Sequence, residues 1–321
     1  MVDSWERARR ILRDAGIPPG RLARLRPLSG GTYNTVEELT LTDGARHVLK
    51  AAPDAPGLSH EKRLLVAEAE FYRGAETAGV PAPRLLALDE AGGVLLMTAS
   101  PGDPWDASLT EAERATLRRE LGRHVAALHR VVGPAFGYPS GALGPLAADW
   151  RTAFTGMLDA VLDDARRFGA RLPGPVDEVA RTLEAAHGAL DEVTVPALVH
   201  FDLWDGNIMV DRSAGSVRVG GLIDGERMFW GDPLAEFVSL ALLGDIRNDE
   251  AFLSGYREAG GRVEFDAPAL LRLALYRAYL CLIMLVETVP RGMGEEQVRW
   301  RDEAVAPELV AALDAIREHA S

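Results

Sequence analysis

The chain has 321 residues, of which 47% are hydrophobic, so it is long enough to bury a sizeable core and to form two lobes. Its net charge of −13 at pH 7 argues against a nucleic-acid or anionic-membrane binder, because an acidic surface repels phosphate groups. The single cysteine, Cys281, excludes an intramolecular disulfide, and the charged N-terminus lacks an apolar signal segment, so a cytoplasmic protein is expected.

The first hundred residues predict a small lobe in which β-strands dominate. The pair Asp43-Gly44 between two apolar runs is typical of a tight hairpin turn. Gly79, with prolines soon after it, marks the end of a long helix. The expected elements are a helix over residues 3–15, strands over 21–28, 35–41 and 46–52, a helix over 59–78, and a hairpin over 85–90 and 93–99.

A linker over residues 100–105 separates this part from a mainly helical remainder. The first helix is expected to open with the capping box formed by Thr110 and Glu113, in which each residue satisfies the other's backbone N–H. The other expected elements are the end of that helix near 132, two further helices, strands over 197–200, 208–211 and 217–223 that form one β island, and helices through 233–320.

The most apolar stretch, residues 270–289, is long enough to span a bilayer. It carries three charged side chains, which membrane insertion would penalise, so a buried core helix is expected. The order of elements predicts an α+β fold with two lobes. Residues 1–99 form the small β-rich N-terminal lobe, and residues 100–321 form the larger, mainly helical C-terminal lobe.

The segment "LVHFDLWDGNIMVD" places polar side chains between two strand-like apolar runs. Asp202 and Asn207 are five residues apart, the spacing at which phosphoryl-transfer sites hold an aspartate that accepts the hydroxyl proton and an asparagine that binds magnesium. Asp224, after the next strand and before a glycine, predicts a second metal ligand. His200 is expected to be a structural hydrogen bonder, and Trp204 to pack beneath the loop or, alternatively, to line an acceptor pocket.

Two upstream residues predict a phosphate clamp. Only Lys50 and Lys62 are lysines among 35 basic residues, and Lys50 lies in the third strand, where a cation can reach the phosphates. The following helix offers Glu68 to orient this lysine. Each signal alone has an ordinary explanation, since Lys50 could be a solvated strand end and Glu68 or Glu70 could face solvent. Their common order favours a kinase-type site.

At these motifs the chain resembles a known family. "LVHFDLWDGNIMVD" followed by "GLIDGERMFWGDPLAEF" is similar to the aminoglycoside phosphotransferase family, and the resemblance extends from about residue 25 to 240. The family shares the protein-kinase-like fold with choline and fructosamine kinases. Phe201 stands where the family pattern has glycine, and Glu236 where aspartate is usual. The pair Leu203-Trp204 resembles fructosamine kinases.

The resemblance implies a role for each matching residue. Asp202 resembles the catalytic base, Asn207 and Asp224 the magnesium ligands, and Lys50 with Glu68 the phosphate clamp. The implied cofactors are ATP and Mg²⁺. The implied nucleotide contacts are a phosphate-covering flap (Ser29, Gly30, Gly31, Thr32, Tyr33 and Asn34), the gatekeeper Met97, and the backbones of Thr98 and Ser100 at the adenine edge.

The motifs do not identify the acceptor molecule, but the distribution of charge along the chain bears on it. Residues 1–100 hold 13 acidic and 13 basic side chains, so the whole acidic excess lies in residues 101–321, where this fold binds its acceptor. We expect a small, cationic antibiotic, an aminoglycoside or a basic peptide, with candidate carboxylates Glu287, Glu295 and Glu296. The acidic excess could instead serve only solubility. The alternatives are a metabolic kinase for fructosamine, choline, homoserine or a sugar, and a catalytically silent kinase-like binding module, which the intact motif residues disfavour.

Overall fold

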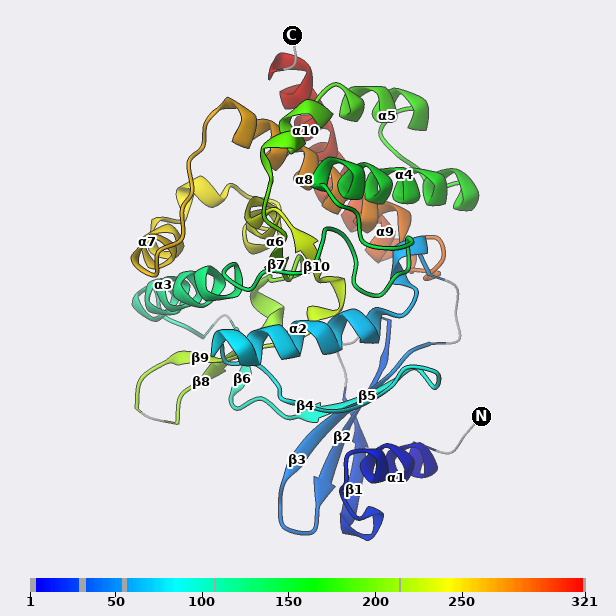
Figure 1. The fold of residues 1–321 in the computed structure, drawn as a ribbon, viewed down its shortest axis with the longest axis vertical. Helices are drawn as coiled ribbons and strands as arrows, with labels where there is room; N and C mark the ends of the chain where they lie inside the picture. The colour runs from blue at the N-terminus through cyan, green and yellow to red at the C-terminus, as the bar shows by residue number, and fades with distance from the viewer. Residues whose placement is uncertain (1–3, 29–32, 54–56, 107, 214, 320–321) are drawn as a thin grey trace.

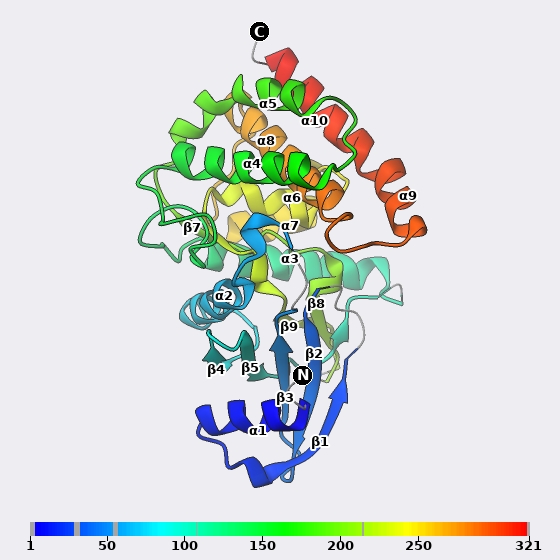
Figure 2. The ribbon, with the colours of Figure 1, turned by 90° about the vertical axis from the view of Figure 1, so that its right-hand side faces the viewer.

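The computed structural model describes residues 4–28, 33–53, 57–106, 108–213 and 215–319. The fold is α+β, as predicted. A β-sheet with one helix beside it forms one end of an elongated molecule, and most helices gather at the other end (Figures 1 and 2). The boundary between residues 99 and 100 stays a prediction.

An antiparallel five-stranded sheet forms the N-terminal end. Lys50 lies on its third strand and pairs with Val36 and Leu95 on either side, so a well-supported strand carries this side chain. The helix α1 (Ser4–Asp14) covers one face with a small apolar core of its own. The strands, in the order β1-β2-β3-β5-β4, are β1 (Leu22–Pro27), β2 (Thr35–Leu41), β3 (Arg46–Ala51), β5 (Val94–Thr98) and β4 (Leu85–Asp89).

The helix α2 (Leu64–Ala78) lies between the sheet and the helical end (Figure 1). The predicted start at residue 59 is wrong. Ser59–Glu61 form a single 3-10 turn, and Arg63 adopts a left-handed conformation with φ 62°, which breaks the helix before Leu64. The helix ends at Gly79 as predicted, where φ is also positive.

The central strands pair differently from the predicted island. The strand β7 (Ala197–Val199) pairs with β10 (Phe229–Gly231), a strand that was not predicted from the sequence. The predicted linker contains a strand as well, β6 (Asp103–Pro104), next to β8 (Ile208–Asp211) and β9 (Arg218–Leu222). Gly102 lets the chain before β6 pass close to β8, because its φ is 87° and a Cβ there would lie 2.1 Å from the Val210 carbonyl oxygen.

The helices form the second end of the molecule. The capping box of Thr110 and Glu113 opens α3 as predicted, but the helix ends at Leu128 rather than near 132. The region 233–320 is interrupted by loops rather than continuously helical. The helices are α3 (Glu111–Leu128), α4 (Trp150–Phe168), α5 (Val176–Glu184), α6 (Glu236–Leu240), α7 (Glu250–Glu258), α8 (Ala267–Val286), α9 (Glu295–Ala304) and α10 (Ala306–His319).

The apolar helix α8 runs through the middle of the helical end (Figures 1 and 2). By length and composition it is the one helix among the described residues that could cross a membrane. However, 78% of its most apolar 18-residue stretch is buried inside the protein. Its tyrosines and leucines pack in the main apolar core, so it is the core helix that its charged residues predicted.

Candidate active site

The loop after β7 carries Asp202 and is fixed at both ends. Asn207 lies at its far end, 5% exposed, and its amide nitrogen donates to the Asp202 carbonyl oxygen at 2.7 Å and to the carboxylate Oδ2 at 3.3 Å. The amide oxygen of Asn207 is thus the atom suited to bind a cation. Burial raises the pKa of Asp202 to about 6, against the opposing influence of the Arg227 guanidinium.

Phe201, the residue before Asp202, occupies the position where the family pattern has glycine, and its surroundings show how a bulky side chain fits there. Phe201 has φ 61°, a conformation that favours glycine and is strained for a bulky side chain. Its ring is fully buried against Phe229 and Tyr279, with ring centroids 5.0 and 5.6 Å away. Its N–H donates to Glu236 at 3.1 Å. Packing and this bond hold a backbone shape that glycine would adopt without strain.

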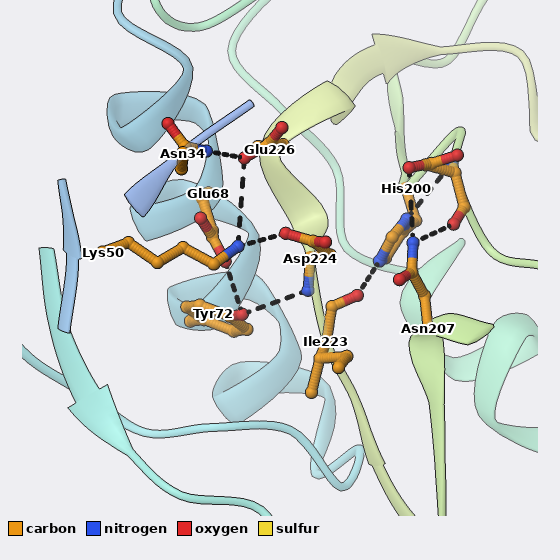
Figure 3. Close-up of polar contacts among 10 residues, drawn as sticks. Asn34, Lys50, Glu68, Tyr72, His200, Asn207, Ile223, Asp224 and Glu226 are labelled. Atoms are coloured by element: carbon orange, nitrogen blue, oxygen red, sulfur yellow. Dashed lines mark hydrogen bonds and ion pairs between the residues drawn. The ribbon is translucent and has the colours of Figure 1, made fainter. Parts of the chain in front are cut away.

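His200 supports the loop from within. It is fully buried; its Nε2–H donates to the Ile223 carbonyl at 2.9 Å, and its Nδ1 accepts the Asp202 N–H at 3.2 Å (Figure 3). Its own N–H donates to Glu236 at 2.7 Å. Burial lowers the pKa of His200 to about 4, so the ring is neutral near pH 7. These contacts orient the loop and leave neither ring nitrogen for proton transfer.

Lys50 lies opposite this loop and points toward Asp224 (Figure 3). Its Nζ is 2.7 Å from Glu68 Oε1 on α2 and also forms an ion pair with Asp224. Burial works against the ammonium, but the surrounding carboxylates outweigh it and raise the pKa of Lys50. Glu68 is fully buried, whereas Glu70 lies at the surface and pairs with Arg73. The structure therefore brings Glu68, and not Glu70, to the lysine.

Asp224 joins the two sides of the site. It follows β9 in a left-handed conformation with φ 65°, and its N–H donates to the Tyr72 hydroxyl at 3.3 Å. Burial would raise the pKa of Asp224, but Lys50 outweighs it and the pKa is lowered. A Cβ on Gly225 would lie 2.3 Å from the Phe71 ring, so only glycine lets this segment pack against α2.

Two members of this site, Glu226 and Tyr72, were not predicted from the sequence. Glu226 Oε2 lies 3.9 Å from Lys50 Nζ and accepts a hydrogen bond from Asn34. Tyr72 donates its hydroxyl to Glu68 at 2.7 Å. A second carboxylate two residues after Asp224 was a visible signal for Glu226, whereas nothing in the local sequence distinguishes Tyr72 from other core tyrosines.

The donor atoms fit a hard divalent cation. Oxygen atoms of Glu68, Asp224 and Glu226 lie within 4.8 Å of one another. The three carboxylates face a single ammonium, and burial raises the pKa of Glu68 and raises that of Glu226 to about 8, so a bound cation would favour the form in which all three are ionised. Magnesium prefers carboxylate and amide oxygens, which the predicted ligands Asp224 and Asn207 supply.

Only some of the remaining predicted nucleotide contacts lie among the described residues. Ser29, Gly30, Gly31 and Thr32 lie outside the described residues, whereas Tyr33 and Asn34 are described at the end of the same loop. Met97 is buried in the main core. Thr98 ends β5 and donates its N–H to the Arg84 carbonyl at 3.0 Å, and its contact with the base stays a prediction. Ser100 lies two residues beyond the end of β5, and its role at the adenine edge stays a prediction.

A cavity of about 470 Å³ opens beside the Asp202 loop. Its lining includes Trp204, Asp205, Asp245, Asp249 and Arg118. Trp204 is 45% exposed and lines this cavity, while its ring packs on Gly206 of the same loop, where a Cβ would lie 2.3 Å from it. Both predicted alternatives for Trp204 therefore hold in part.

Among the predicted acceptor carboxylates, Glu287 is unsuitable. It is 3% exposed and lies between three arginine side chains, Arg227, Arg291 and Arg301. Its carboxylate oxygens are engaged by guanidinium groups inside the protein, so a solvent-borne acceptor cannot pair with it. Glu295 and Glu296 are exposed at the start of α9.

Comparisons with known proteins find one matching family model and several solved structures of similar fold. A family model described as "Phosphotransferase enzyme family" matches residues 24–276. A search of curated protein sequences finds no significant match. Among solved structures, one described as a fructosamine-3-kinase from Thermobifida fusca YX-ER1 has a TM-score of 0.70 at 22% identity and covers 97% of this chain and 98% of its own.

Two further structures extend this likeness. A choline/ethanolamine kinase family protein from Mesorhizobium loti has a TM-score of 0.58 at 21% identity, over 98% of this chain and 99% of its own. The complex of the aminoglycoside phosphotransferase APH(2")-IIa with streptomycin and ATP has a TM-score of 0.60 at 17% identity, over 98% and 99%. At these identities the similarity establishes the two-lobe, kinase-like fold.

Proposed function

Because the chain belongs to the phosphotransferase enzyme family, we propose that it transfers the γ-phosphate of ATP to a hydroxyl group of a cationic small molecule, an antibiotic such as an aminoglycoside or a basic peptide. The family membership and the kinase-like relatives make it a small-molecule phosphotransferase. Enzymes of this fold use ATP, usually with Mg²⁺. The residues of this chain and their surroundings support the finer assignments.

The main support for the proposed nucleotide chemistry is the way in which residues 223 and 224 connect the two sides of the site. Asp224 pairs with Lys50 on one side, while the preceding residue, Ile223, is bonded to both ends of the catalytic loop on the other. The Ile223 N–H donates to the Asn207 carbonyl at 3.0 Å, and its carbonyl accepts from His200. These bonds join the Lys50 clamp, the two proposed metal ligands and the half-buried carboxylate of Asp202 in one unit.

Each side chain then has a defined task. Asp202 accepts the proton of the acceptor hydroxyl as that oxygen forms a bond to the γ-phosphorus. The bond from phosphorus to the bridging oxygen breaks, and ADP leaves with the electron pair. Lys50 offsets negative charge on the phosphates, and Glu68 orients the lysine. Asn207 and Asp224 would hold Mg²⁺, which supplies further charge neutralisation when bound.

The lysine clamp gives a test with a matched control. Glu68→Gln is expected to raise the nucleotide KM and lower kcat, each by about tenfold, because Lys50 loses a buried anionic partner. Glu70→Gln should change neither value by more than about twofold, since Glu70 is a surface residue of the same helix. Steady-state kinetics on both variants checks this. The reverse result would place the clamp on the other helix face.

The cavity beside Trp204 supports a cationic acceptor. Its lining holds three aspartates and one arginine, and Arg118 lies 2.6 Å from Asp249 and 3.8 Å from Asp205. Asp245 pairs with Arg247 at 2.7 Å. Three aspartates thus face two arginines at this surface, an excess of one negative charge, and an exposed indole offers a face for a cation or a sugar ring.

A screen of ATP consumption over antibiotics and metabolic alcohols tests the proposal. We expect turnover with a cationic acceptor, whose KM should rise at least about fivefold between low and high salt because screening shortens the reach of the acidic field. Asp245→Asn should raise this KM about threefold, whereas Glu303→Gln on α9, away from the cavity, should not. Locating the phosphate by NMR identifies the hydroxyl.

The second candidate is a metabolic kinase, with fructosamine as the foremost acceptor. The Leu203-Trp204 pair favours it, because this pair resembles the fructosamine kinases and its tryptophan lies at the cavity beside the loop. If the screen finds turnover only with a neutral or anionic acceptor, or a KM that is flat with salt, this candidate replaces the antibiotic and the acidic excess serves solubility.

A further inference from the structure

Three successive residues before α2 are fastened to the helical end of the molecule. Ser59 donates its N–H and its hydroxyl to Asp164 on α4, at 2.5 and 2.8 Å. The buried ring of His60 stacks on Tyr138, with centroids 5.5 Å apart. Glu61, 4% exposed, forms an ion pair with Arg291, which follows α8. These contacts explain why residues 59–61 leave the helix that their sequence predicts.

Arg291 is the point where several of these parts meet. Its guanidinium contacts Glu61 in the turn before α2, and its carbon Cζ lies 4.8 Å from the centre of the Tyr33 ring, at the end of the predicted phosphate flap. It also lies 3.2 Å from Glu287 Oε2. One side chain from the helical end therefore contacts both the flap end and the turn that leads into the helix carrying Glu68.

Glu287 anchors this arginine to the catalytic centre. It lies at the C-terminal end of α8 and pairs with Arg227 at 2.9 Å and with Arg301 at 3.0 Å. Arg227 comes three residues after Asp224 in the chain, and its charge acts on Asp202. The ion pairs thus run without interruption from the turn before α2 to the segment that follows the metal ligand.

We propose that Arg291 is a positioning residue for the nucleotide. Held by Glu287, it fixes Tyr33 and the start of α2, so that the flap end and the Lys50–Glu68 clamp are set before ATP arrives. This inference rests on the proposed function for its nucleotide. This role differs from general stabilisation of the fold. Arg301 also pairs with Glu287, but among the described residues its hydrogen bonds go to Met284, Gln297 and Glu287, and not to Tyr33 or Glu61.

The chain offers a matched pair of variants. Arg291→Ala leaves Glu61 bonded to the Leu58 N–H at 2.8 Å and Glu287 bonded to two arginines, so neither carboxylate is left without a donor. Arg301→Ala removes one ion pair from the same glutamate without touching the N-terminal lobe. Replacing Glu287 itself would leave several buried guanidinium groups uncompensated and endanger folding, so it is not the variant to use.

We expect Arg291→Ala to weaken the binding of Mg·ADP and raise the ATP KM by about tenfold, with kcat changed less than about threefold. Arg301→Ala should leave both constants within about twofold, although both variants lower Tm. In ligand-free protein, amide exchange over residues 58–68 should accelerate only in Arg291→Ala. Glu61→Gln should reproduce part of the effect and add little to it in the double variant.

Equal effects of the two arginine variants on Mg·ADP affinity, or no effect of Arg291→Ala in a folded protein, would overturn the positioning role alone. Failure of the proposed function would give a different result: the wild-type protein itself would bind no Mg·ADP in the same calorimetric titration. A drop in kcat with an unchanged ATP KM would also contradict the inference, because the contacts of Arg291 lie on the nucleotide side.

Discussion

Asp202→Asn is expected to lower kcat by at least about 100-fold, the usual scale for a positioned general base. The asparagine keeps the size of the side chain but cannot accept the hydroxyl proton. The fold should survive, because burial raises the pKa of Asp202 to about 6 and a neutral amide is easier to bury than a carboxylate. Single-turnover kinetics gives the effect, while Tm and calorimetric ATP binding are the controls.

The wild-type pH profile belongs to the same prediction. With a raised pKa of about 6, Asp202 is mostly ionised at pH 7 and ready to take a proton. Below about pH 6 it is increasingly protonated, so kcat/KM should fall about tenfold for each further pH unit. The residual activity of Asp202→Asn should lack this limb. Turnover near the wild-type value in the variant would remove Asp202 from the mechanism.

Asp224→Ala is expected to abolish magnesium-dependent nucleotide binding, with an affinity loss of about 100-fold or more. Asn207→Ala should cost about tenfold, because a neutral amide contributes less electrostatic stabilisation to a divalent cation than a carboxylate does. The alanine also frees Lys50 from one partner, but Glu68 and Glu226 remain beside its ammonium. The lysine should therefore stay in place, and the loss reports on the metal.

Calorimetric titration of ATP, with magnesium and with a chelator, measures both variants. In wild-type protein the chelator should weaken binding strongly, and in Asp224→Ala it should make little further difference. An Asp224 variant whose ATP affinity still depends on magnesium as strongly as that of the wild type would contradict the assignment. A larger loss in Asn207→Ala than in Asp224→Ala would reverse the ranking of the two ligands.

The sequence by itself determined the features that depend on neighbouring residues. The five-residue spacing of Asp202 and Asn207 lies within one turn, where backbone and side chain bond directly at 2.7 Å. The capping box that opens α3 and the turn at Asp43-Gly44 are equally local. Helical periodicity put both Glu68 and Glu70 on α2, but the choice of Glu68 rested on the kinase-type order of motifs.

Contacts between distant parts of the chain needed the tertiary structure. Strands of three residues such as β7 and β10 carry too little pattern to reveal their partners. Glu226 joins the site through Asn34, 192 residues away in the chain, and Arg291 reaches Glu61 across 230 residues. The helical periodicity of the sequence extends over residues 59–78, but the bonds of Ser59 to Asp164 and of Glu61 to Arg291 hold residues 59–61 outside the helix. Local preference is worth tenths of a kcal/mol per residue, whereas a buried charged hydrogen bond is worth about 1.5 to 3 kcal/mol, so packing decides wherever the two disagree.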